Sequence, residues 1–279
     1  MRESITTPKS FFLPRVSDMT TDNGFLKHGI EHLSPSSINM SMGSMSAWCV
    51  RYLMQQRFPS GGAAERGKAV EIGVAHGVFT DAPVEECVAL ALETFDRVMQ
   101  LDDFAGLADR DKYRAEVEAM VPIAVSELRP LGKPTPAPDG TNQHEIGIAC
   151  RFREGDNGTV HIKGFLDFFY ADTPLVVDLK TTTRSPSAFS QAHALQASVY
   201  ARATGAPVRF LYVTPKKATW LEITPDEVEQ NLGLVKEQVR RIERFLNLND
   251  DAKLLTQAAP HDPSSFYWRG AERLLELIE

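Results

Sequence analysis

The sequence is poor in cysteine: its 279 residues include only Cys49, Cys87 and Cys150. These three are far apart and odd in number, which argues against a disulfide framework and against a zinc site built from paired cysteines. A reducing, cytoplasmic setting is therefore expected. The sequence also lacks any stretch approaching about 18 uninterrupted apolar residues, so no membrane span is predicted. Its opening residues, MRESITTPKS, lack the apolar core of a signal peptide.

An excess of positive charge is also missing, because 30 Lys and Arg residues face 37 Asp and Glu residues, for a formal net charge of −7. This balance argues against a protein that coats nucleic acid regardless of sequence, although a local basic strip can coexist with an acidic whole. The 43% of apolar residues excludes disorder over the whole chain. The composition is otherwise that of an ordinary globular protein.

The predicted elements change character at a proline-rich segment, residues 130–140. Before it lie an irregular arm, 1–33, and a helical part, 34–130, with helices expected at 35–57, 63–79, 83–100 and 110–129. After it, β-branched and aromatic runs predict a sheet core over 143–223, with strands at 143–153, 158–170, 175–182, 207–213 and 218–223 and a helix at 186–203. Residues 224–279 are expected to be helical, beginning with a long helix that has Pro225 in its first turn and ends near residue 247.

This order of elements predicts a single α/β (or α+β) domain over residues 1–279, in which a helical N-terminal elaboration precedes the sheet core. The helix between the strands at 175–182 and 207–213 favours a crossover that joins two parallel strands. No internal repeat is visible.

Two aspartates face each other if residues 171–174 form the loop of a hairpin. Tyr170 then pairs with Leu175, and the same register brings Asp167 opposite Asp178 on one face of the sheet. Two such carboxylates repel each other, and their aromatic and aliphatic neighbours predict burial, which isolated charges do not tolerate. Mg²⁺ or Mn²⁺ would compensate for both effects, because these cations prefer oxygen ligands.

Lys180 lies two residues after Asp178, so strand alternation places it on the same face. A lysine beside a metal-bound water can orient that water, help to deprotonate it, or stabilise developing negative charge. An Asp-x-Lys triplet alone usually marks a solvated strand face, and it is the opposing Asp167 that favours a hydrolytic site. The interpretation depends on the register, because a slip of one residue would send the two acids to opposite faces.

Four short motifs follow one another along the chain: Arg66-Gly67-Lys68-Ala69-Val70-Glu71, Gly164-Phe165-Leu166-Asp167, Asp178-Leu179-Lys180 and Gln196-Ala197-Ser198-Val199-Tyr200. In this order they resemble the PD-(D/E)XK nuclease superfamily, and within it the RecB-type branch that includes phage exonucleases. The resemblance covers residues 33–215, and Glu71 stands where many relatives have histidine. It implies a restriction-endonuclease-like core, with a central mixed sheet flanked by helices.

The resemblance implies a metal-dependent DNA nuclease, most naturally an exonuclease of recombination, repair or phage DNA metabolism. It implies Mg²⁺ or Mn²⁺ held by Glu71, Asp167, Asp178 and the carbonyl of Leu179, with Lys180 assisting hydrolysis. Gln196 and Tyr200, which share one helix face at i and i+4, would then bond to the water, the lysine or a phosphate. His76 is a weaker alternative to Glu71, and His193 is either near the DNA or an ordinary surface residue.

Several relatives hold an iron–sulfur cluster, which needs four thiolates, so no cluster is expected in a chain with three cysteines. DNA contacts must come from local basic side chains, for which the candidates are Arg51, Arg57, Arg66, Lys68, Arg184, Lys216 and Lys217. No membrane partner is expected, whereas a homo-oligomer or a recombination partner protein stays possible. The alternative function is a catalytically silent protein of this fold that binds DNA ends or a recombination partner, and the intact set of acids disfavours it.

Overall fold

The computed structural model describes residues 23–101, 104, 106–154 and 158–278. Most of the expected irregular arm, residues 1–22, lies outside this range. The described end of the arm is more ordered than expected, because it forms α1 (Gly24–Lys27) and the two-residue strand β1 (His32–Leu33). β1 pairs in parallel with β3, more than 120 residues further along the chain, and so ties the N-terminal segment to the sheet core.

The helix predicted over 35–57 is broken. It forms α2 (Pro35–Gly43), α3 (Met45–Trp48) and a π-helical turn, η2 (Cys49–Leu53). The break is at Ser44, whose extended backbone ends α2 while its side chain accepts a hydrogen bond from the Ala47 N–H and caps α3.

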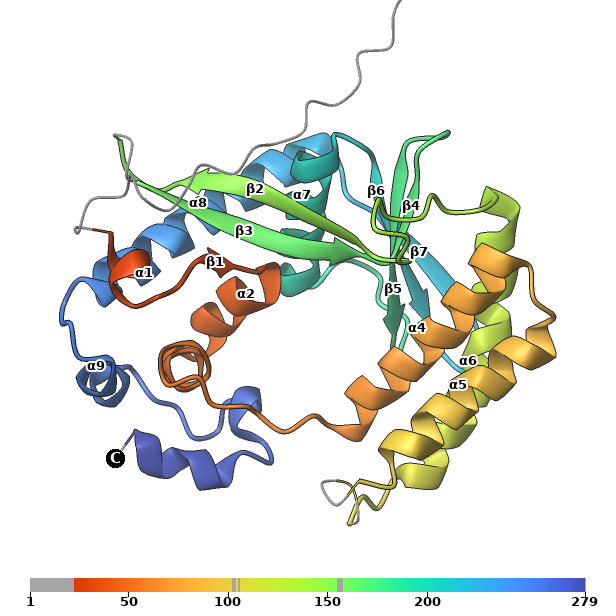
Figure 1. Ribbon diagram of the computed structural model, residues 1–279, viewed down its shortest axis with the longest axis horizontal. Coiled ribbons are helices and arrows are strands. Elements are labelled where there is room, and N and C mark those ends of the chain that lie inside the picture. The colour runs from red at the N-terminus through yellow and green to blue at the C-terminus, as the bar shows by residue number, and fades with distance from the viewer. Residues whose placement is uncertain (1–22, 102–103, 105, 155–157, 279) are drawn as a thin grey trace, which may run out of the picture.

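The next three helices agree with prediction: α4 (Gly62–Thr80), α5 (Val84–Val98) and α6 (Arg110–Leu128), the last followed by a 3₁₀ turn, η4 (Arg129–Leu131). Figure 1 shows these three helices side by side at one edge of the molecule, against the strands. Gly73 and Gly77 of α4 lie directly against Cys87 of α5, which explains the small residues in this helix.

The strands form two mixed sheets instead of one central sheet. The first has the order β1-β3-β2, in which β2 (His144–Arg151) and β3 (Thr159–Leu166) are antiparallel. The second has the order β4-β5-β6-β7, built from β4 (Phe168–Tyr170), β5 (Leu175–Thr181), β6 (Val208–Val213) and β7 (Ala218–Glu222). The architecture is therefore mixed α/β, as predicted.

Asp167 separates the two sheets, and it divides the strand that was predicted over 158–170. Its backbone lies between β3 and β4, and its Oδ2 accepts a hydrogen bond of 2.8 Å from the backbone N–H of Leu179 in β5. The carboxylate thus replaces a rung of the backbone ladder where the chain passes from one sheet to the other.

The predicted hairpin register is confirmed. Phe168 pairs with Val177 and Tyr170 pairs with Leu175, so the turn is 171–174 and the next position inward brings Asp167 to Asp178. The parallel pairing of β5 with β6 is confirmed as well, and α7 (Gln191–Thr204) lies between them in sequence. α7 begins later than predicted because Ser190 caps it, accepting a hydrogen bond from the His193 N–H.

β5 is buried on both faces, and alternation decides which core each side chain enters. Val177 and Leu179 belong to the core shared with α4, α5 and α6, whereas Val176 packs into a second core that includes Leu195 and Val199 of α7. Asp178 and Lys180 have the same parity as Val176, so they lie on the α7 side of the sheet.

The C-terminal part begins as predicted with α8 (Pro225–Leu246), whose Pro225 follows a capping box made by Thr224 and Glu227. α8 packs along α7 behind β2 and β3 (Figure 1). The rest of this part, also expected to be helical, forms α9 (Ala252–Ala258) and two 3₁₀ segments, η5 (Phe266–Trp268) and η6 (Glu272–Leu277). Within the described ranges, no helix combines the length and hydropathy that a membrane span requires.

Candidate active site

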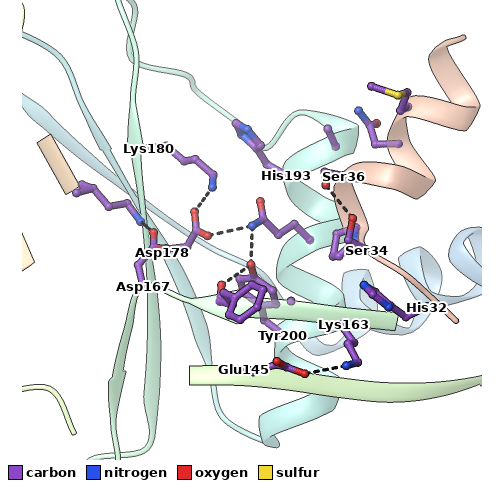
Figure 2. Close-up of a pocket in the computed structure, with 18 of the residues that line it drawn as sticks. His32, Ser34, Ser36, Glu145, Lys163, Asp167, Asp178, Lys180, His193 and Tyr200 are labelled. Atoms are coloured by element: carbon purple, nitrogen blue, oxygen red, sulfur yellow. Dashed lines mark hydrogen bonds and ion pairs between the residues drawn. The ribbon is translucent and has the colours of Figure 1, made fainter. Parts of the chain in front are cut away.

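A cavity of about 800 Å³ opens where the two sheets meet. Its walls come from segments far apart in sequence: α2, η2, α4, β2, β3, β5 and α7. Figure 2 shows Asp178 and Lys180 on one side of it, and Ser34 and His32 on the other. Glu71, Asp167, Asp178 and Lys180, which the sequence motifs singled out, all line it. The fold therefore brings the predicted acids and lysine into one place.

Asp178 is the most deeply buried of the acids, with 1% of its surface exposed. Its Oδ1 lies 2.5 Å from Nζ of Lys180, while its Oδ2 accepts a hydrogen bond of 3.1 Å from Nε2 of Gln196. Among the described residues, the ammonium of Lys180 is the one polar partner of Oδ1. Burial raises the pKa of Asp178 above its usual range, and the ammonium of Lys180 opposes this rise.

Asp167 and Glu71 complete a group of three acids. Burial, followed by the charges of Asp178 and Glu71, holds the pKa of Asp167 well above its ordinary value. Glu71 reaches the cavity from α4, where its Oε1 accepts a hydrogen bond of 2.5 Å from Gln143. Burial raises the pKa of Glu71, and the charge of Asp178 adds to this rise, whereas the hydrogen bond from Gln143 opposes it. The three carboxylates repel one another at neutral pH.

Lys180 is the cation that these acids share. Burial opposes its charged form, but the charges of Asp178 and Asp167 outweigh burial and raise its pKa above the usual value. The ammonium also lies 5.2 Å from the ring centre of Phe210, and a quarter of the side chain stays exposed toward the cavity. Lys180 is therefore a fixed positive charge in the site at neutral pH.

Gln196 and Tyr200 face the acids from α7, as their spacing predicted. Nε2 of Gln196 donates to Asp178 and also to the hydroxyl of Tyr200 at 2.7 Å, and that hydroxyl donates to the carbonyl of Phe165 at 2.7 Å. Tyr200 is buried, so its hydroxyl is committed inside the protein. In this structure the pair connects α7 to β3 and orients Asp178.

Gly164 makes room for Tyr200. A Cβ at position 164 would lie 2.7 Å from Cε1 of Tyr200, and two hydrogen bonds hold that ring in place. We expect Gly164→Ala to lower the free energy of unfolding by about 1–3 kcal/mol, the usual cost of overpacking. Urea unfolding measures this, with Gly147→Ala as the control, because a Cβ at Gly147 meets only the Ile162 carbonyl at 3.7 Å. Equal losses for the two variants would contradict the assignment.

Other cavity residues gave little signal in the sequence. His193 packs against Phe210 and Tyr212, and its Nδ1 lies 2.7 Å from the hydroxyl of Tyr212. Burial and the nearby Lys180 charge lower the pKa of His193 to about 4, so the ring is neutral at pH 7. The N-terminal wall includes His32, Ser34, Ser36, Asn39, Arg51 and Tyr52. It reaches the site because β1 pairs with β3, and a two-residue strand carries no periodicity that could predict this.

The basic candidates differ in position. Arg66 is wrong as a DNA-contacting group, because it is 4% exposed and forms an ion pair with Glu116 of α6 inside the protein. Lys68 is exposed and bonds to Glu65 at 2.7 Å. Arg184 is exposed in the loop after β5, and the exposed pair Lys216 and Lys217 lies in the β6–β7 turn. These four lie outside the cavity lining, whereas Arg51 is part of it.

The donor set suits a hard divalent cation, although the acids are not gathered into a finished coordination sphere. Among the described residues, no three His, Cys, Asp or Glu side chains are placed to hold a metal ion together. Two features still fit a cation: the buried Oδ1 of Asp178 has no described partner besides Lys180, and three acids with raised pKa values share that one lysine. Carboxylate oxygens are the ligands that Mg²⁺ and Mn²⁺ prefer. The three cysteines are buried free thiols away from this cavity.

A family model described as the PD-(D/E)XK nuclease superfamily matches residues 32–266. The chain belongs to this superfamily, because the match covers most of its length, and its mixed α/β architecture is consistent with the restriction-endonuclease-like fold. Proteins of this superfamily are nucleases that generally use divalent metals. The match is to the superfamily as a whole, so the RecB-type branch stays a prediction.

Among solved structures, the crystal structure of SSO0001 is similar to this chain, with 19% sequence identity and a TM-score of 0.30. The alignment covers 37% of this chain and 50% of that chain, so it spans half the length of the other protein. A comparison with curated proteins gives no match.

Proposed function

We propose that this protein is a Mg²⁺- or Mn²⁺-dependent exodeoxyribonuclease, which hydrolyses phosphodiester bonds of DNA starting at its ends. One observation carries the proposal: Asp167, Asp178 and Lys180 meet at the junction of the two sheets, in a cavity open to a substrate. Three acids and one lysine leave an excess of negative charge there. A phosphate approaching the site therefore needs a further positive charge beside it.

Glu71, Asp167, Asp178 and the carbonyl of Leu179 are the groups that would hold the metal. When bound, Mg²⁺ or Mn²⁺ would supply Lewis acidity toward the phosphate and lower the pKa of a water ligand. Asp167 is suited to this task because its Oδ2 is already fixed by the Leu179 N–H, which leaves its other oxygen for the cavity.

Lys180 acts in its charged form. Because its pKa is raised, it is a poor base at neutral pH, so of the roles open to it we favour charge stabilisation over proton abstraction. Its ammonium, exposed toward the cavity, would donate a hydrogen bond to the phosphate oxygen on which charge develops in the transition state. Gln196 keeps Asp178 in the required orientation, and Tyr200 holds Gln196.

The test is a cleavage assay with the purified protein. End-labelled linear DNA, single- and double-stranded, is incubated with Mn²⁺, with Mg²⁺ or with EDTA, beside covalently closed circular DNA. We expect linear DNA to be shortened to mononucleotides or short products with either metal, and circular DNA to persist. Cleavage of circles at the same rate would contradict action at ends while leaving a nuclease. Absence of cleavage in both metals would contradict the proposal and favour a protein that only binds DNA.

A further inference from the structure

Phe165 is a large apolar side chain exposed beside the acids. It is 52% exposed, it lines the cavity, and it lies two residues before Asp167. Isolated exposed apolar side chains are common on protein surfaces and need no explanation. Phe165 is distinguished by its position, because it lines the cavity near the end of β3, and the candidate metal ligand Asp167 follows directly after that strand.

The alternation of β3 fixes the direction of this ring. Residues at even positions, such as Ile162 and Leu166, are buried toward the helices, and Gly164 lies flat against Tyr200. The odd positions face the other way, which places Lys163 and Phe165 in the cavity wall next to Asp167. The ring therefore belongs to the cavity that Asp167 also lines, two residues before that acid in the chain.

The backbone beneath the ring is held rigidly. The carbonyl of Phe165 accepts the hydrogen bond from Tyr200, and Tyr200 is linked through Gln196 to Asp178. On its other side Phe165 pairs with Glu145 of β2. Among the residues that the structure describes, no aromatic ring stacks on Phe165, so its face is available to a ligand.

Other residues that line the cavity add groups that suit an unpaired nucleotide. Tyr52 and Tyr267 line it, and Nδ2 of Asn39 donates to the Tyr267 hydroxyl at 2.8 Å. The hydroxyls of Ser34 and Ser36 lie 2.9 Å apart at the start of α2 (Figure 2). A cavity lined by rings and small polar groups resembles the stacking sites that proteins use for single-stranded nucleic acid.

We propose that Phe165 is a stacking platform for the base next to the scissile phosphate, which makes single-stranded ends the preferred substrate. The inference rests on the proposed function, since it assigns the substrate of that same site. Within a duplex each base face is covered by its neighbours, so a ring in this cavity can reach only a base that has left the stack. The phosphate attached to that base would then lie beside Asp167 and Lys180.

The test measures binding without cleavage, using the full-length protein in EDTA at low salt. A single-stranded oligonucleotide with 2-aminopurine at its terminal positions serves as the probe, and both fluorescence quenching and anisotropy are recorded. We expect Phe165→Ala to weaken binding about 10-fold and to remove most of the quenching, because stacking of one base is worth this order of affinity. Phe165→Trp should restore both, and Leu254→Ala, with a side chain 51% exposed on α9, should change neither.

The outcomes separate this inference from the proposed function. If Phe165→Ala binds and quenches as the unchanged protein does, or if the unchanged protein does not bind the probe, stacking is wrong, whatever the cleavage assay gives. If Phe165→Ala weakens binding of blunt duplex as much as that of the single strand, the preference for single strands is wrong. Thermal melting of each variant verifies folding, which substitution at so exposed a position should preserve.

Discussion

Replacing Lys180 with alanine is expected to lower the rate of DNA cleavage about 1,000-fold, with little change in KM. This is the magnitude usually lost when one fixed donor to a transition-state charge is removed. Lys180 is the one described cation in contact with Asp178, and its ammonium faces the cavity. The measurement is the initial rate of cleavage of end-labelled DNA at saturating Mn²⁺, with KM obtained from the substrate dependence.

Lys27→Ala is the matched control. The Lys27 side chain is 24% exposed, against 25% for Lys180, and it also forms an ion pair, with Asp250, but α1 is outside the cavity lining. It should cleave DNA at the unchanged rate. Loss of Lys180 leaves buried acids with less compensation and can weaken the fold, so Lys180→Arg provides a second variant that keeps the charge.

Arg differs from Lys in reach and in the direction of its donors, so Lys180→Arg is expected to fold normally and still lose at least 100-fold in rate. Full activity of Lys180→Arg would mean that only charge matters at this position. Full activity of Lys180→Ala would remove the lysine from the mechanism altogether.

The position of the acids could be predicted because it follows from local rules. A four-residue turn fixes the register of a hairpin, and strand alternation sets the face of each residue, so the sequence alone predicts Asp167, Asp178 and Lys180 on one face. The same holds for Gln196 and Tyr200, which are one helical turn apart and share a face of α7.

The predictions that were wrong concern features that depend on side-chain contacts, some of them with segments distant in sequence. Arg66 belongs to a motif, but its partner Glu116 lies 50 residues away on another helix, and only tertiary packing shows that the guanidinium is buried. The helix predicted over 35–57 is broken at Ser44, because its side chain accepts a hydrogen bond from the Ala47 N–H and so starts a new helix in place of continuing the first. The strand predicted over 158–170 was divided because the Asp167 carboxylate, and not its backbone, bonds to the neighbouring strand.

Replacing Asp167 with asparagine is expected to abolish cleavage and, in EDTA, to stabilise the protein. Burial and the charges of Asp178 and Glu71 raise the pKa of Asp167, so its ionised form costs folding free energy at neutral pH. Asparagine removes the charge and can still accept the hydrogen bond from the Leu179 N–H. The free energy of unfolding should therefore rise, while the cleavage rate falls at least 1,000-fold, by analogy with the loss of a catalytic group.

The pH dependence of this gain has a definite sign. A carboxyl group whose pKa is higher in the folded than in the unfolded protein stabilises the fold when protonated, and that contribution is lost as the pH rises through the folded pKa. The advantage of Asp167→Asn over the unchanged protein should therefore be small near pH 4 and grow toward neutral pH. Urea unfolding in EDTA at several pH values measures it.

Asp172→Asn is the control for this variant, because Asp172 is exposed in the turn of the same hairpin. It should alter neither cleavage nor stability by more than about 0.5 kcal/mol, as is usual for surface substitutions. Adding Mn²⁺ should raise the melting temperature of the unchanged protein and of Asp172→Asn, and raise that of Asp167→Asn much less, because a ligand stabilises the state that binds it. If Asp167→Asn is destabilised in EDTA, the ionised Asp167 does not cost folding free energy as proposed. If this variant gains as much from Mn²⁺ as the unchanged protein, Asp167 does not bind the metal.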